Sequence, residues 1–406
     1  MAVRRKQIII KVTSPVDDSI IEIWKDVPIQ FTKELNAGLG ECIIRLDKIF
    51  DYSGNDLVLG NYVEILIADK DTCDPTKQSG DSNARSIYQG YISLIEREAV
   101  GGKETVIVHL LGHYTKLALD ILKDGVQTTL YSHAANGLTT VVGSQSAADI
   151  GLMMRTVIDR YRVENPGAKI GYFSDDIPDT ATTATYRFEQ KTYREAMDKL
   201  RQLAPVGVNW YIDECGNVKF KAAPTEPTHK FVFGKDFNAV KVEQSMEKVR
   251  NFLLIWNGET GGAVVYKHYQ DDESIAQFGR RAEAVNDYGV DNSNAADAIG
   301  AKFLAENKDA EIKVTVRILD NNESDNLGYD IESIQPGDTC SFYGFTIGIS
   351  DIFRDNMLIS KVVYTPEYVE VEVEAVKSGL LDFQEQQGKA INDLGTGGLQ
   401  IPETYT

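Results

Sequence analysis

The chain has 406 residues, 42% of them hydrophobic, and a formal net charge of −19 at neutral pH. Such a length exceeds what one hydrophobic core usually organises, so several domains are expected, and the acidic excess disfavours sequence-independent binding to nucleic-acid phosphates. No apolar stretch reaches the roughly 18 residues of a membrane span, and Met1–Lys6 lacks the apolar run of a signal peptide, so we expect a soluble protein made in a cytoplasm.

Residues 1–120 are predicted to be antiparallel β structure. Short alternating segments bounded by turn signals predict strands at 7–12, 19–24, 29–35, 41–46, 62–68, 87–96 and 104–111. Asn36–Gly40 predicts a turn, and the polar stretch Asp69–Arg85 predicts an exposed loop. Many short strands of this kind are typical of a sandwich or a barrel. We interpret the region as a first small, tube-like β-barrel domain.

Residues 121–228 are predicted to form a mixed α/β domain. Apolar residues recur at helical spacing from Ile150 to Tyr161. Thr192 and Glu195 have the spacing of a capping box, which predicts the start of another amphipathic helix. A β-hairpin over 208–220 follows it. We interpret this helix and hairpin as a bracket between two β regions.

Residues 229–376 return to β structure. Strands are predicted at 230–233, 239–242, 251–257, 263–269, 311–319, 338–343, 357–365 and 368–375, with one inserted helix at 294–307. Residues 377–406 are predicted to be a C-terminal extension with a short helix and a glycine-rich tail. The expected fold class is therefore β-rich α+β, with two similar small antiparallel β-barrels flanking a mixed α/β domain.

The two β regions contain a weak internal repeat. In each, a Gly-polar turn leads into a strand, an Ile-Ser strand follows, and an alternating strand closes the region. The stretches are 60–64, 91–96 and 104–108 in the first region, and 337–341, 358–363 and 367–371 in the second. The repeat favours a duplicated small barrel.

The last predicted strand carries a row of carboxylates. Glu370, Glu372 and Glu374 alternate with three valines, so one face is apolar and the other acidic. Two interpretations stay open at this stage. The row is either an ordinary solvated face or an acidic wall lining a channel.

No motif predicts catalysis, and we expect no catalytic, cofactor-binding or metal-binding residues. His109 and His113 have the spacing of a zinc-protease helix but lack its glutamate, so a structural role is expected. Asp320–Asp325 is rich in oxygen ligands but lacks the glycine and final glutamate of a calcium-binding EF-hand, which favours a solvated loop. The four cysteines, Cys42, Cys73, Cys215 and Cys340, form no CxxC pair, and we expect them to be reduced.

Three groups of stretches resemble the tail hub proteins of tailed bacteriophages and related injection systems. The first β region contributes Leu59–Ile65 and Tyr88–Ser93, the middle region Tyr193–Phe220, and the second β region Ser274–Arg281, Val285–Asp287 and Ile334–Asp338. The resemblance implies a homotrimer whose two barrels per chain make a pseudo-sixfold ring. It also implies contacts with the tail tube or distal tail protein, the tape measure protein, and a central fibre or spike. Viral DNA would pass through the lumen only in transit, in a virion tail tip or baseplate.

Two other classes of function are considered. One is a hydrolase of the host wall, either a peptidase or a glycosidase, since sequence cannot show which carboxylates face each other. The other is a carbohydrate-binding receptor module that uses Trp24, Trp210 or Trp256, although all three lie in predicted strands and are expected in the core.

Overall fold

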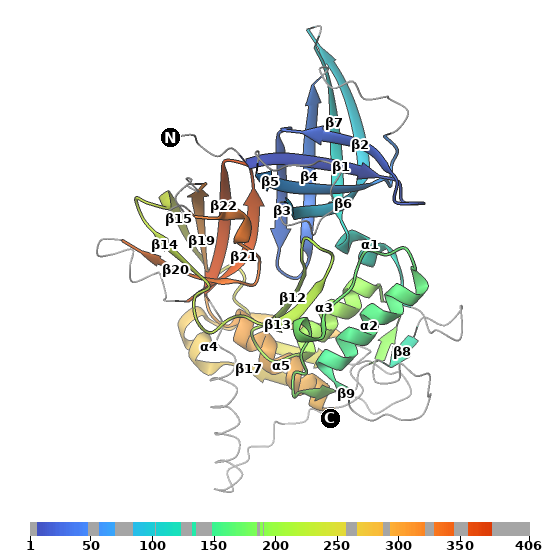
Figure 1. The fold of residues 1–406 in the computed structure, drawn as a ribbon. Helices are drawn as coiled ribbons and strands as arrows, with labels where there is room; N and C mark the ends of the chain where they lie inside the picture. The colour runs from blue at the N-terminus through green and yellow to red at the C-terminus, as the bar shows by residue number, and fades with distance from the viewer. Residues whose placement is uncertain are drawn as a thin grey trace, which may run out of the picture.

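The computed structural model describes most of the chain with gaps. The described residues are 6–47, 57–69, 84–101, 103–122, 132–134, 148–184, 187–189, 191–256, 266–286, 293–320, 329–344 and 356–375. The predicted C-terminal extension, residues 377–406, and residues 70–83 of the predicted loop Asp69–Arg85 lie outside these residues, whereas Asp69 ends one strand and Ala84 and Arg85 begin the next. Figure 1 shows two β regions beside each other, with the helices gathered below them.

The first β unit, residues 6–112, contains seven strands. They are β1 (Lys6–Thr13), β2 (Ile20–Lys25), β3 (Ile29–Glu34), β4 (Gly38–Asp47), β5 (Tyr62–Asp69), β6 (Ala84–Val100) and β7 (Lys103–Gly112). All seven predicted strands are confirmed, and β4 begins inside the predicted turn because Asn36 and Gly38 complete the reversal with positive φ. The long β6–β7 hairpin rises above the rest of the unit (Figure 1).

The middle unit contains the helix and hairpin predicted as a bracket. Its elements are α1 (Tyr114–Leu119), β8 (Ser132–Ala134), β9 (Ala148–Asp149), α2 (Ile150–Glu164), β10 (Thr183–Ala184), β11 (Arg187–Glu189), α3 (Tyr193–Leu203), β12 (Val208–Ile212) and β13 (Val218–Ala222). The capping box is confirmed, since Thr192 accepts from the Glu195 amide while Glu195 accepts from the Thr192 amide. No described helix has the length and apolar character required to span a membrane.

The second β unit consists of β14 (His229–Val232), β15 (Phe237–Ser245), β19 (Glu311–Leu319), β20 (Thr339–Tyr343), β21 (Met357–Tyr364) and β22 (Tyr368–Ala375). An insertion separates β15 from β19. It holds β16 (Phe252–Trp256), β17 (Tyr266–Gln270), α4 (Asp272–Phe278), β18 (Ala282–Asn286) and α5 (Ser293–Asn307). The short helix α4 and strand β18 were not predicted.

One 13-stranded sheet runs through both β units. Its path is β15-β19-β22-β21-β3-β4-β7-β6-β5-β1-β2, with β20 on β21 and β14 on β20. The order β3-β4-β7-β6-β5-β1 in the first unit is repeated as β15-β19-β22-β21-β20-β14 in the second. The predicted repeat is therefore confirmed as strand order, although β14 lies parallel to β20 whereas β1 lies antiparallel to β5. The path is open among the described strands, so closure into two barrels stays a prediction.

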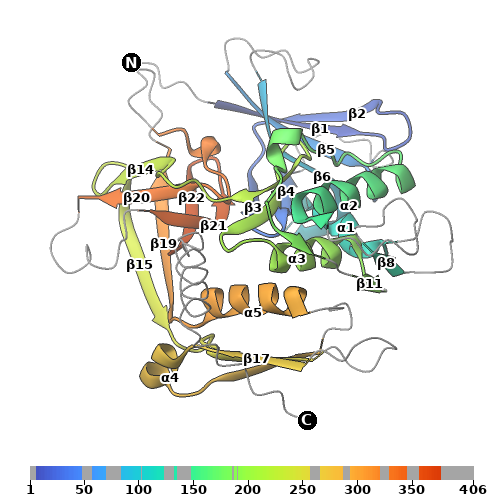
Figure 2. The same cartoon turned by 90° about the horizontal axis from the view of Figure 1, so that it is seen from below.

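Two hydrophobic cores form behind this arrangement. The larger core spans both β units, from Ile8 in β1 to Val373 in β22. The smaller core joins α2, α3 and the hairpin to the insertion, through Leu253 and Ile255 of β16 and Ile299 of α5. Figure 2 shows α5 between α3 and the β16–β17–β18 sheet. The insertion therefore packs against the helices as well as continuing the second β unit in sequence.

A buried lysine connects α5 to the end of α3. The Lys302 side chain is 3% exposed, and its ammonium donates to the carbonyls of Arg201, Pro205 and Val208. Arg201 lies in the last turn of α3, Pro205 just beyond it, and Val208 begins β12, so the ammonium connects the end of the helix to the hairpin. Burial lowers the pKa of Lys302 to about 7, opposed by the nearby Glu306 carboxylate.

This lysine predicts a stability that rises with pH. Between about pH 7 and the ordinary lysine pKa of 10.5, the unfolded chain holds a proton that the folded chain has lost. The free energy of unfolding should therefore increase across that range and fall as pH returns to 7. Urea denaturation at several pH values measures this slope. In Lys302→Met the slope between pH 7 and pH 10 should be smaller, and an unchanged slope would contradict the assignment.

Candidate functional site: the junction between the two β units

The two β units are joined edge to edge by β3 and β21. The strands are antiparallel, with Glu34 opposite Lys361 and Phe31 opposite Tyr364. The rings of Phe31 and Tyr364 stack at a centroid distance of 4.8 Å inside the shared core. The outer face carries an ion pair of 2.6 Å between Lys361 Nζ and Glu34 Oε1. Apolar packing on one face and charge pairing on the other thus hold the junction.

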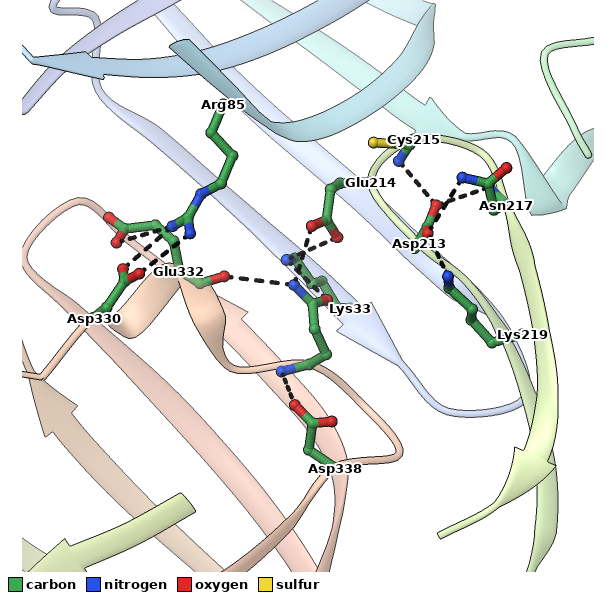
Figure 3. A network of polar contacts seen from close by, with 11 residues as sticks. Lys33, Arg85, Asp213, Glu214, Cys215, Asn217, Lys219, Asp330, Glu332 and Asp338 are labelled. Carbon is green, nitrogen blue, oxygen red and sulfur yellow. Dashed lines mark hydrogen bonds and ion pairs between the residues drawn. The ribbon is translucent and has the colours of Figure 1, made fainter. Parts of the chain in front are cut away.

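A buried cation, Lys33, lies at the centre of this junction. In β3 the inward positions are Ile29, Phe31 and Lys33, so the strand alternation directs the lysine into the interior. Its ammonium donates to Gln335 Oε1 at 3.1 Å and lies 3.7 Å from Glu214 Oε2. Burial lowers the pKa of Lys33, and the Glu214 carboxylate opposes that shift. Figure 3 shows how β3, the hairpin and the second β unit meet at this one side chain.

A second cluster of charges ties β6 to the second β unit. Arg85 donates to both carboxylate oxygens of Asp330, each at 3.2 Å, and lies 3.5 Å from Glu332 Oε2 (Figure 3). Glu332 is buried and accepts a hydrogen bond of 3.1 Å from the Tyr364 hydroxyl. Burial raises the pKa of Tyr364, so this phenol remains a donor. A planar guanidinium held by two carboxylates fixes orientation as well as distance.

The hairpin β12–β13 completes the junction from the side of the helices. Asn36, in the β3–β4 turn, exchanges hydrogen bonds with the backbone of Trp210 in β12. At the hairpin tip, Lys219 pairs with Asp176 and Asp213 at 2.6 Å and 3.3 Å. The hairpin therefore contacts the first β unit and supplies Glu214 to Lys33. Glu214 Oε1 also accepts from Gln335 Nε2 at 3.4 Å, so the hairpin contacts both β units, as predicted for a bracket between them.

The acidic row on β22 lies within a mixed-charge face. Glu372 pairs with Lys313 of β19 at 2.6 Å, and Glu370 lies opposite Arg317 in the strand register. The first β unit has a comparable cross-strand contact, in which His109 Nδ1 of β7 lies 2.7 Å from Glu41 Oε1 of β4. Cross-strand cations thus partly neutralise the row, which the sequence pattern of one strand cannot show.

Several of the described histidines and cysteines lie in packed surroundings. His113 is buried against the Tyr62 ring at 5.8 Å, and burial lowers its pKa to about 4. Cys42 and Cys340 are buried in strands. Among the described residues no three His, Cys, Asp or Glu side chains form a metal-binding group. Cys73 and most of the oxygen-rich loop, residues 321–328, lie outside those residues.

The three tryptophans divide between core and surface. Trp24 and Trp210 are buried, as predicted. Trp256 is 42% exposed, so its placement in the core was wrong. It occupies the last position of β16, opposite Tyr266 of β17, and Tyr266 is 40% exposed. The buried positions of β16 are Leu253 and Ile255, so strand alternation places Trp256 on the opposite face of the sheet, away from the core.

The sequence analysis missed Lys33 and Glu332. A charged residue at an inward position of an alternating strand was the available signal for Lys33. Nothing comparable marks Glu332, which lies in a short 3₁₀ turn, Ile331–Ser333. Its buried position results from contact with Arg85, which is 247 residues away in the chain and therefore invisible to local patterns.

We expect the Lys33 contacts to stabilise the fold as a unit. Lys33→Met should lower the free energy of unfolding by about 1–3 kcal/mol, because Glu214 and Gln335 lose their donor. The double variant Lys33→Met with Glu214→Gln should be more stable than the single variant, because the unpaired carboxylate is removed. Chemical denaturation of the four proteins in this cycle measures the coupling. Strictly additive effects would show that Lys33 and Glu214 do not interact.

Comparison with known proteins gives a consistent fold relationship. No family model and no curated protein sequence matches the chain. Among solved structures, the 43 kDa tail protein of prophage MuSo2 from Shewanella oneidensis is similar with a TM-score of 0.60 and 13% identity, covering 92% of this chain and 99% of that one. A tail protein from Neisseria meningitidis has a TM-score of 0.58 and 9% identity, covering 92% and 98%. Prophage tail protein gp18 from Listeria monocytogenes has a TM-score of 0.52 and 12% identity, covering 95% and 99%. The chain therefore has the fold of bacteriophage tail proteins, which confirms the resemblance predicted from its sequence.

Proposed function

We propose that this chain is a structural hub of a phage tail tip or baseplate. Three copies form a ring that joins the tail tube or distal tail protein, with the tape measure protein, to a central fibre or spike. The ring lets viral DNA pass during ejection. The role is non-enzymatic, in keeping with the tail proteins that share the fold.

The observation that carries this proposal is the repeated strand order within one continuous sheet. Two β units of the same strand order lie edge to edge in each chain, so three copies would supply six such units. A threefold assembly could then match a sixfold tube on one side and a threefold fibre or spike on the other. We further propose the predicted organisation: tube-like domains at 1–120 and 229–376, a mixed domain at 121–228, and an extension at 377–406.

A carbohydrate-binding receptor module is the second candidate, favoured by one feature. Trp256 and Tyr266 are exposed side by side at the end of the β16–β17 hairpin. Aromatic faces of this kind offer apolar contact with a polar edge. Binding to a glycan array that is lost in Trp256→Ala would support this role. The hydrolase alternative has no comparable observation in its favour.

The hub proposal predicts a defined mass in solution. Static light scattering of the purified chain should give about 135 kDa, three times the 45.1 kDa of one chain. Negative-stain imaging of the same sample should show a ring with a central pore. A 45.1 kDa particle at the highest soluble concentration would contradict self-assembly of the isolated chain.

The mixed-charge face is proposed to line the pore. Reversing Glu370, Glu372 and Glu374 to lysine should leave the fold intact, since these side chains are only half-buried on the outer face. DNA ejection from assembled particles should slow, because an attractive wall would retain a passing polyanion. Asp175→Lys with Glu226→Lys and Glu273→Lys, at three exposed sites outside β22 and the β15 edge, adds the same charge and is the control. Equal ejection rates in all particles would contradict a pore-lining position.

A further inference from the structure

The internal repeat can be aligned residue by residue at its bulges. The β6–β7 ladder shifts register between Ile92 and Leu94, and the β21–β22 ladder shifts between Ile359 and Lys361. The skipped residue is a serine in both. Ser93 Oγ donates to the His109 carbonyl at 3.0 Å, and Ser360 Oγ donates to the Glu372 carbonyl at 3.3 Å. Ser93 and Ser360 are therefore equivalent, so residues 94–97 of β6 correspond to residues 361–364 of β21.

The same alignment relates β3 to β15. Leu110 of β7 and Val373 of β22 are equivalent, since they face Ile92 and Ile359. The next strand places Cys42 beside Leu110 in the first unit and Val314 beside Val373 in the second. The outer strand then places Phe31 beside Cys42 and Val242 beside Val314. Phe31 thus corresponds to Val242, and residues 31–34 of β3 correspond to residues 242–245 of β15.

The junction within the chain uses one member of each equivalent pair. Residues 31–34 of β3 pair with residues 361–364 of β21. Their counterparts, residues 242–245 of β15 and 94–97 of β6, have no strand on their outer edges among the described residues, since these segments pair only with β19 and β7. One chain therefore presents both halves of a second junction, at separate places, with neither half used.

The two unused edges also carry exposed apolar and charged side chains. Leu94 and Met246 are 46% and 54% exposed, which is unusual for large apolar side chains at sheet edges. The end of β15 borders a depression lined by Glu243, Ser245, Glu311 and Lys313. Glu98 is exposed on β6, and Lys241 of β15 has a 68% exposed side chain that pairs with Glu243 at 2.5 Å within the chain. Pairing of the edges would bring Glu98 to Lys241 and place Glu96 opposite the Glu243 carboxylate that Lys241 already neutralises.

We propose that β15 of one copy pairs antiparallel with β6 of the next copy, in the register of the β3–β21 junction. Arg97 then lies opposite Val242, Glu96 opposite Glu243, and Leu94 opposite Ser245 of the neighbouring copy. Glu98 lies opposite Lys241 of the neighbouring copy. The partner is a second copy of this chain, and the inference rests on the proposed ring function because it names the contact between copies.

This pairing is head to tail, because the two edges differ. Each copy would use β15 towards one neighbour and β6 towards the other, as a closed ring requires and a twofold dimer does not. All joints of the ring would then be alike. Half would be β3–β21 within a chain and half β15–β6 between chains.

A disulfide test follows from the register. In a Cys73→Ser, Cys215→Ser background, the variant Glu96→Cys with Glu243→Cys places two cysteines directly opposite each other, where Cβ atoms lie about 4.5–5.5 Å apart. Mild oxidation should produce covalent dimers and trimers on a non-reducing gel. Glu96→Cys with Ala239→Cys moves one exposed partner four residues along β15 and is the matched control, expected to cross-link at least tenfold less.

Light scattering on the same samples separates the two levels of the proposal. A trimer in which Glu96→Cys with Glu243→Cys forms no more cross-link than the control would overturn the β15–β6 interface and leave the trimer standing. A monomer without cross-links would contradict both the interface and the self-assembling ring. A trimer with selective cross-links confirms the register.

Discussion

Hydrogen bonding between β3 and β21 is the constraint on which the rest of this structure depends. A strand edge leaves a row of unpaired backbone groups, and here one edge of each β unit satisfies the other. The pairing makes one sheet from two halves of the sequence and places one hydrophobic core behind both. The β12–β13 hairpin contacts this joint through Glu214, and α3 packs on the hairpin, where Trp210 Nε1 donates to Asp198.

Charged groups at the joint give it a defined geometry. Lys33 needs acceptors once β3 carries it inside, and Gln335 and Glu214 come from two other parts of the chain. Arg85 and Glu332 add a second connection a short distance away. Apolar contacts alone tolerate sliding, whereas a buried ammonium with fixed acceptors favours one arrangement of the three units. A rigid joint is what the proposed ring would require.

Duplication explains how one chain can serve an assembly. Equivalent bulges, with Ser93 and Ser360 bonded to equivalent carbonyls, indicate that the two units follow one structural plan. Each unit has an outermost strand, β3 or β15, and an edge segment, in β6 or β21, to which such a strand can pair. Among the described strands, only β3 and β21 are paired in this way within the chain. The insertion between β15 and β19 distinguishes the second unit and packs on the helices. Because the two units share one strand order, the edge of one can pair with the edge of the other. The insertion is the feature that makes the second unit differ from the first.

The sequence by itself determined the local elements. Alternation placed the long strands, the Thr192–Glu195 capping box placed the start of α3, and the repeated Ile-Ser segments indicated two similar units. These features depend on neighbours within a few residues, which a sequence displays directly. Tertiary structure alone decided which edges meet, that Lys33 and Glu332 are buried partners of distant groups, and that cations offset the acidic row of β22. Such contacts join residues that are far apart in the chain, so their energies appear only once the strands have paired.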